Sequence, residues 1–157
     1  NELAQAKGAN VAGLDIAAEM LRQPVFPQNE FEEVVKSFTT GVENGMKEPQ
    51  VIAMIAMNRH LLPYPKGDVR YRSTSEEQLE NLRAVKLDDL KNFHKQFYGA
   101  SAAQLSVVGD FDEPAIRAQL QKLFGDWKAA MPFTRISNSF REIAPVNQSF
   151  QTPDKAN

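Results

Sequence analysis

The chain has 157 residues, a hydrophobic fraction of 42%, a charged fraction of 24% and a formal net charge of −2, which suit one domain of ordinary size. This charge balance, without any Lys/Arg cluster, argues against a nucleic-acid binder and a polybasic membrane patch, because both need a basic surface. The absence of cysteine excludes disulfides and thiolate metal sites, and no apolar run reaches the roughly 18 residues of a membrane helix.

Three helices are predicted in the first part of the chain. Apolar residues at helical spacing predict one over residues 14–22, which Pro24 and Pro27 end. Asn29 is expected to cap the second helix, whose first turn is acidic. Its apolar stripe comprises Phe31, Val34, Val35, Phe38 and Val42. A third helix is predicted over residues 50–62, with Val51, Ile52, Met54, Ile55 and Leu62 buried.

A loop and two further helices are predicted next. Proline and glycine make residues 63–68 an extended loop. Ser73 or Ser75 is expected to cap a helix over residues 76–85, and Ser75 followed by Gln78 resembles a capping box. Another amphipathic helix is predicted over residues 86–98.

The last part of the chain contains the clearest strand signal, Gln104 to Val108. Asp112 is expected to cap a helix over residues 113–124, with Gly125 as its end and Trp127 as an anchor. Trp127 and the pair Phe93 and Phe97 are expected to anchor helices against the sheet, and replacement of Trp127 by alanine is predicted to cost ~3–5 kcal/mol. After Pro132 the chain reads as a linker that re-enters a strand near residues 149–151. A lone strand cannot satisfy the hydrogen bonds of its backbone N–H and C=O groups, so further strands are expected. The α+β class therefore fits best.

His60 and His94 are the only histidines, and each lies in an apolar helical stretch. A catalytic zinc takes three protein ligands, and the zincin motifs place two histidines one helical turn apart. Neither motif occurs, so both histidines are expected to be structural, and a metal site built from them and a remote carboxylate is the weaker alternative.

Carboxylates offer the other candidate chemistry. Asp110 and Asp112 follow the predicted strand, where paired carboxylates can hold magnesium, but no Gly-rich phosphate loop accompanies them, so helix capping is favoured. Glu30, Glu32, Glu33 and Glu43 are expected to form the solvated face of a helix. No hydroxyl pairs with a histidine to suggest a Ser-His-Asp constellation.

A polar-aromatic loop is formed by two tyrosines that flank three basic residues. Such a loop could contact a peptide or pack against the rest of the domain, and packing is favoured. Its members are Tyr64, Lys66, Arg70, Tyr71 and Arg72.

From about Leu14 to Trp127 the chain resembles an M16-type domain, as in the insulinase, pitrilysin and mitochondrial-processing-peptidase family, with Leu21 to Phe31 similar to a step in its first half and residues 64–127 similar to its second half. The similarity rests on the order of a short helix, a helix ending in an aromatic pair, an apolar-Val-Gly-Asp strand and a helix ending Phe-Gly-x-Trp. The stretches that carry it are residues 64–71, 76–79, 87–100, 105–112 and 124–127, together with Leu21 to Phe31 upstream.

This resemblance implies a LuxS/MPP-like metallohydrolase fold, with helices on one face of a mostly antiparallel sheet whose first strands this piece lacks. It implies a partial domain over residues 1–131, then a linker and the first strand of a following domain over 132–157. Both ends look clipped from a longer chain, as in an interior domain of a long bacterial member. The family would also have strand material between Gly8 and Leu14, where the sequence shows none.

Catalytic members bind zinc through His-x-x-Glu-His and a later glutamate. The first motif is absent, and alignment from Phe26 places Val34 and Gly41 where the family has its two later glutamates, with Glu33 and Glu43 only nearby. The resemblance therefore implies a non-catalytic domain with no catalytic, cofactor-binding or metal residues of its own, and zinc in the parent protein only.

Three functions follow, in decreasing order of support. The first is a non-catalytic wall of a peptide-enclosing chamber in a zinc metallopeptidase, and the second is an inert peptide-binding or assembly module of the same fold. The third is an unrelated magnesium enzyme that uses Asp110 and Asp112. The expected partners are a peptide or protein substrate and other M16-type domains of the same chain, without nucleic acid or a membrane span. A homodimer stays open, and the resemblance favours a bacterial periplasm.

Overall fold

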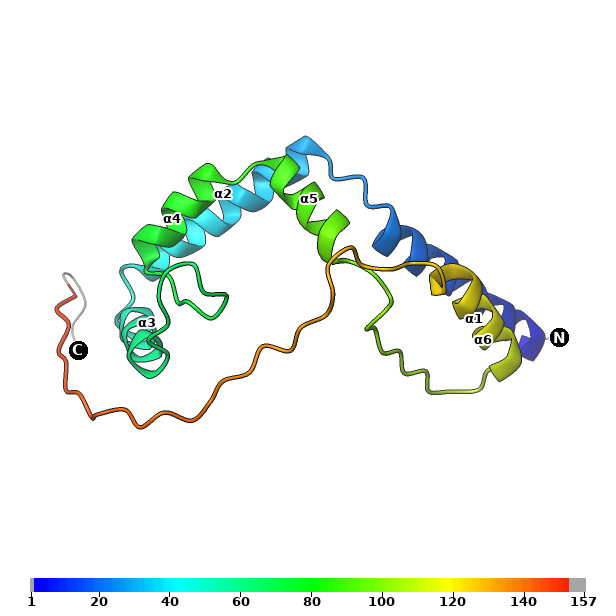
Figure 1. The fold of residues 1–157 in the computed structure, drawn as a ribbon. Coiled ribbons are helices and arrows are strands. Elements are labelled where there is room, and N and C mark those ends of the chain that lie inside the picture. The colour runs from blue at the N-terminus through cyan, green and yellow to red at the C-terminus, as the bar shows by residue number, and fades with distance from the viewer. Residues whose placement is uncertain (1, 153–157) are drawn as a thin grey trace. The chain divides into compact units, whose positions relative to one another are not determined.

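The computed structural model describes residues 2–152 and, within them, the side chains from residue 12 onward. The described part contains six α-helices (Figure 1). They are α1 (Glu2–Arg22), α2 (Gln28–Gly45), α3 (Pro49–Leu61), α4 (Ser75–Ala84), α5 (Leu87–Phe97) and α6 (Glu113–Phe124). No helix of this part is long and apolar enough to cross a membrane.

The predicted α+β fold with an antiparallel sheet is wrong, because residues 2–152 contain helices and extended segments but no strand. The segment from Gln104 to Val108 does not pair, and no backbone hydrogen bond joins it to another described segment. Residues 149–151 are likewise unpaired. Alternation favours an extended backbone, but a strand exists only where a neighbour accepts its ladder of hydrogen bonds. The first helix also covers the stretch from Gly8 to Leu14.

The chain divides into two compact units, each formed by two separate stretches. Unit 1 comprises Asn1–Phe26 and Leu87–Thr134 and includes α1, α5 and α6. Unit 2 comprises Pro27–Lys86 and Arg135–Asn157 and includes α2, α3 and α4.

In unit 1, α1 packs along α6. Ala18 and Ile116 are the buried apolar side chains of this helix pair, with 2% and 6% of their surface exposed. Arg22, in the last turn of α1, donates to both carboxylate oxygens of Asp126 at 2.9 and 3.3 Å and to the carbonyl of Leu123. Its guanidinium also lies 5.8 Å from the ring centroid of Trp127. These contacts join the end of α1 to the residues that follow α6.

In unit 2, α2 packs along α4. The start of α4 is fixed by a capping box. The Thr74 hydroxyl accepts from the Glu77 N–H at 3.2 Å, and a Glu77 carboxylate oxygen accepts from the Thr74 N–H at 2.9 Å. The two reciprocal bonds satisfy N–H groups that a helix start leaves unpaired. The box was predicted at Ser75 and Gln78, one residue too late.

Two other predicted helix ends have different outcomes. Asn29 does not cap α2, because the helix begins at Gln28, two residues earlier than predicted, and Pro27 occupies the cap position without a side-chain bond. Asp112 does cap α6, since its carboxylate accepts from the Ala115 N–H at 3.0 Å. Gly125 ends α6 as expected.

None of the residues in the predicted apolar stripes of α2 and α3 is buried in the described structure. On α2, Val34 and Phe38 are 51% and 62% exposed, and α3 has no buried residue. The buried side chains of unit 2 are Tyr64 and Leu79. The helical spacing was therefore predicted correctly, whereas the burial predicted for these stripe residues is not found in the part of the chain that the structure describes.

Candidate functional site

The two histidines lie in different units, and each ring bonds to a main-chain carbonyl. In unit 2, His60 Nε2 lies 2.8 Å from the Ala144 oxygen. In unit 1, His94 Nε2 lies 2.8 Å from the Leu21 oxygen, and its ring centroid lies 4.7 Å from that of Tyr98. In each histidine, one ring nitrogen is thus used in a hydrogen bond to a main-chain carbonyl. A structural role was predicted for both residues.

The described residues include no group of three or more His, Asp or Glu side chains that could hold a metal ion. Asp112 Oδ1 accepts from the Ala115 N–H at the α6 cap, as the capping interpretation predicts. The α2 glutamates are spread along that helix, and Glu32 accepts from the Gln28 amide at 2.7 Å. A catalytic zinc needs three protein ligands and one open position. The described residues do not bring three such ligands together.

Tyr64 forms the centre of the polar-aromatic loop in unit 2. Its ring, 7% exposed, lies 3.9 Å from the Arg70 guanidinium and 4.6 Å from that of Arg141. Its hydroxyl donates to Asn138 Oδ1 at 3.3 Å. Arg70 also donates to both carboxylate oxygens of Asp68 at 2.9 and 2.8 Å. The side-chain and backbone hydrogen bonds from Arg70 lower the pKa of Asp68 to about 2.

Glu77 forms a second cluster beside this loop. Its carboxylate accepts from the Tyr71 hydroxyl and lies 3.1 Å from Lys66 Nζ and 3.7 Å from Arg59 Nη1. The Thr74 N–H first, and then the Tyr71 and Lys66 donors, lower the pKa of Glu77 to about 2. The loop side chains thus bond within unit 2, as the packing interpretation predicts.

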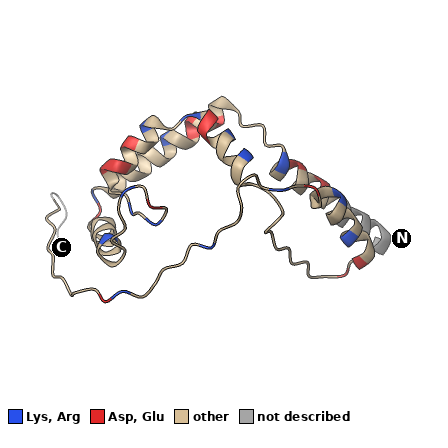
Figure 2. Ribbon diagram, in the orientation of Figure 1, with Lys and Arg blue, Asp and Glu red and all other residues tan. Residues whose placement is uncertain are grey.

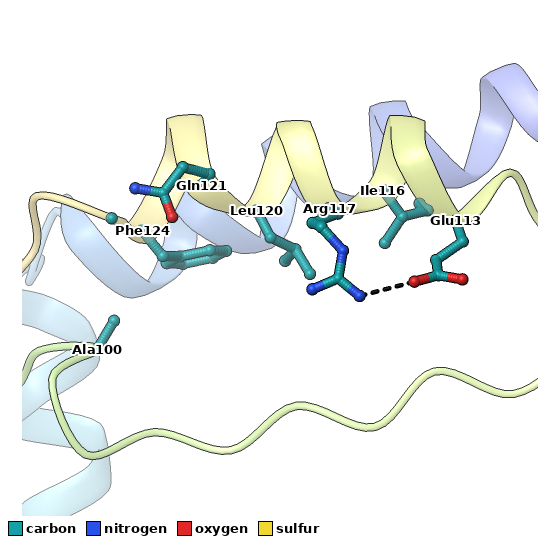
Figure 3. A pocket seen from close by; sticks show the side chains of 8 residues that line it. Ala100, Glu113, Ile116, Arg117, Leu120, Gln121 and Phe124 are labelled. Carbon is teal, nitrogen blue, oxygen red and sulfur yellow. Dashed lines mark hydrogen bonds and ion pairs between the residues drawn. The ribbon is translucent and has the colours of Figure 1, made fainter.

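Unit 1 has an open hollow of about 400 Å³ along one face of α6 (Figure 3). Its floor is apolar and one edge carries the Arg117–Glu113 ion pair, whose closest atoms are 2.6 Å apart. No nucleophile is paired with a base among the lining residues. They are Ala100, Glu113, Ile116, Arg117, Leu120, Gln121, Phe124 and Gly125.

Charge is mixed along the described helices. Both signs of charge occur on each of α2, α4 and α5 (Figure 2), and on α4 they are carried by Glu76, Glu77 and Glu80 with Arg83. Such a distribution has no single-sign stripe of the kind that attracts nucleic acid.

Residues 84–156 match the family model described as Peptidase M16 inactive domain. No curated protein and no solved structure matches the chain. The matched stretch contains α5, α6 and the extended segment that follows them. It includes the aromatic pair, the apolar-Val-Gly-Asp run and the Phe-Gly-x-Trp ending on which the sequence resemblance rests. Over residues 84–156 the chain is therefore similar to the inactive domain of the M16 peptidase family.

Proposed function

We propose that the chain is a non-catalytic domain of a zinc-dependent metallopeptidase and forms part of the chamber that encloses the peptide. In this proposal, another M16 domain of the same polypeptide supplies the zinc and the group that activates water. The contribution of this chain is a surface that completes the enclosure.

The match of residues 84–156 to an inactive M16 domain supports the proposal most strongly. The sequence contains no His-x-x-Glu-His motif, and neither histidine has a second histidine one turn away. A peptidase of this class needs both imidazoles on one helix face, so cleavage by this chain alone is not expected.

Exposed apolar faces support assembly with a further domain. On α5, Phe93 and Phe97 stack with ring centroids 4.9 Å apart, yet 52% and 51% of their surfaces are exposed. Contiguous exposed apolar side chains of this size are typical of interaction surfaces.

A cleavage assay tests this proposal. A quenched fluorescent peptide library is incubated with the chain alone and with the complete polypeptide that joins it to a His-x-x-Glu-His domain. Cleavage is expected only for the complete polypeptide, and Phe93→Ser with Phe97→Ser should reduce it, whereas Lys95→Ser on the same helix should not. Cleavage by the chain alone would refute the proposal. A complete polypeptide without cleavage or zinc would favour the inert binding module.

A further inference from the structure

The extended segment of unit 2 over residues 135–150, here called the strap, lies against α3 and the loop that follows it. Two contacts involve strap carbonyls. Arg70 Nη1 donates to the Ser137 oxygen at 3.1 Å, and His60 Nε2 lies 2.8 Å from the Ala144 oxygen. Contacts to main-chain oxygens recognise an extended backbone whatever its side chains are.

Two further contacts depend on strap side chains. Asn138 accepts from the Tyr64 hydroxyl at 3.3 Å, and the Arg141 guanidinium stacks 4.6 Å from the centroid of the Tyr64 ring. Tyr64 is buried, so it offers the strap a fixed aromatic face.

At the far end of the strap, the side chain of Phe150 is 41% exposed and forms one wall of an apolar hollow. Phe150 helps to line a hollow of about 380 Å³, whose other apolar walls are Met46, Ile52, Ile55 and Ala56. The strap-binding groove is therefore defined here as the surface that runs from Arg70 and Tyr64 past His60 to this hollow.

The strap is held at separated points rather than along its length. Between them, Phe140 is 94% exposed and Val146 is 55% exposed, so little apolar surface is buried. A segment with few buried contacts opens at low free energy. Its tether to the rest of the chain supplies a high effective concentration, which keeps weak contacts formed.

From these contacts we infer that the groove is a binding site for an extended peptide and that the strap occupies it in cis as a competitor. The partner is a peptide with an arginine and an aromatic residue at the spacing of Arg141 and Phe150. Backbone carbonyls of such a peptide would accept from Arg70 and His60, its arginine would stack on Tyr64, and its aromatic ring would line the hollow in place of Phe150.

A labelled synthetic peptide of residues 135–152 tests the inference by fluorescence anisotropy against the full chain. The strap variant, Arg141→Ala with Phe150→Ala, changes only strap side chains and removes the two that compete with the peptide. It should bind the peptide at least about 10-fold more tightly than the unsubstituted chain, because the tethered competitor is weakened. A peptide with alanine at both positions is the matched control and should not bind.

The groove is tested by adding Arg70→Gln to the strap variant, with circular dichroism to verify that the helices persist. This change should weaken peptide binding several-fold, since it removes a carbonyl donor and a ring contact of Tyr64. Equal peptide affinity for the unsubstituted chain and the strap variant, or binding insensitive to Arg70→Gln, would overturn the inference. A concentration-dependent dimer abolished by the strap substitutions would also overturn it, because the occupant would then be the strap of a second copy.

Discussion

The Tyr71 hydroxyl lies 2.9 and 2.7 Å from the two carboxylate oxygens of Glu77. This contact joins the end of the polar-aromatic loop to the first turn of α4. The same carboxylate completes the capping box with Thr74, so one side chain fixes both the start of a helix and the loop before it.

The stability of unit 2 should depend on the ionisation of Glu77. Its pKa is lowered from 4.5 to about 2 in the folded chain by the donors around it. The folded state therefore binds protons less readily than the unfolded state, so the contribution is fully present above about pH 5. It is lost as pH falls from that range towards pH 2. Urea unfolding followed by circular dichroism should show this decline.

Glu77→Gln should flatten that decline, because a glutamine cannot titrate. Asp68, with a pKa also lowered to about 2, should supply part of the remaining dependence. Glu33→Gln, on α2, is the matched control and should leave the pH profile unchanged. An unaltered profile in Glu77→Gln would contradict the assignment.

Thr74→Ala should destabilise α4. It removes the hydroxyl that accepts from the Glu77 N–H while leaving the Glu77 carboxylate in place. Loss of an N-cap hydroxyl costs about 1 kcal/mol. The free energy of unfolding in urea measures this, with Ser75→Ala as the adjacent control. Equal losses in the two variants would mean that Thr74 is not the cap.

Gly99→Ala should destabilise unit 1. A Cβ at this position would clash with the Ala129 nitrogen and would lie 2.7 Å from the Lys128 carbonyl carbon, both backbone atoms. The neighbouring Ala100 N–H donates to the Trp127 oxygen at 2.7 Å, so a displaced backbone would break that bond too. Overpacking of this kind costs about 1–3 kcal/mol.

Gly13→Ala, in α1 of the same unit, is the control, because a Cβ there meets nothing within 4 Å. It should stabilise the helix by about 0.5–1 kcal/mol, since alanine loses less conformational freedom than glycine on folding. The fluorescence of Trp127, the single tryptophan of the chain, reports unit 1 in both variants. Similar unfolding curves for the two would contradict the close approach at Gly99.

Trp127→Ala should cost about 1–3 kcal/mol, less than the ~3–5 kcal/mol of a fully buried aromatic side chain. The ring is half-buried and contacts Phe124 and the Arg22 guanidinium, with centroid distances of 6.1 and 5.8 Å. Urea unfolding followed by circular dichroism measures the loss. A value near zero would show that these contacts are not stabilising.

Helix positions could be predicted well from the sequence because their signals are local. Prolines 24 and 27 precede α2, and Asp112 caps α6 as expected. The capping box was misplaced by one residue because Ser73, Thr74 and Ser75 are all competent caps, and Glu77 selects Thr74.

Sheet formation and burial could not be predicted in the same way, because both depend on distant partners. The segment from Gln104 to Val108 has the alternation of a strand, but no described segment pairs with it. The contacts of Arg22 with Asp126 and of Arg141 with Tyr64 join residues far apart in sequence, and no local pattern indicates either. The domain boundary between residues 131 and 132 stays a prediction.

Zinc content, measured by elemental analysis on the purified chain and on the complete polypeptide that carries it, tests the central claim most directly. The account predicts about one zinc per complete polypeptide and none bound stoichiometrically by the chain alone. Stoichiometric zinc in the chain alone, lost on His60→Ala or His94→Ala, would contradict it.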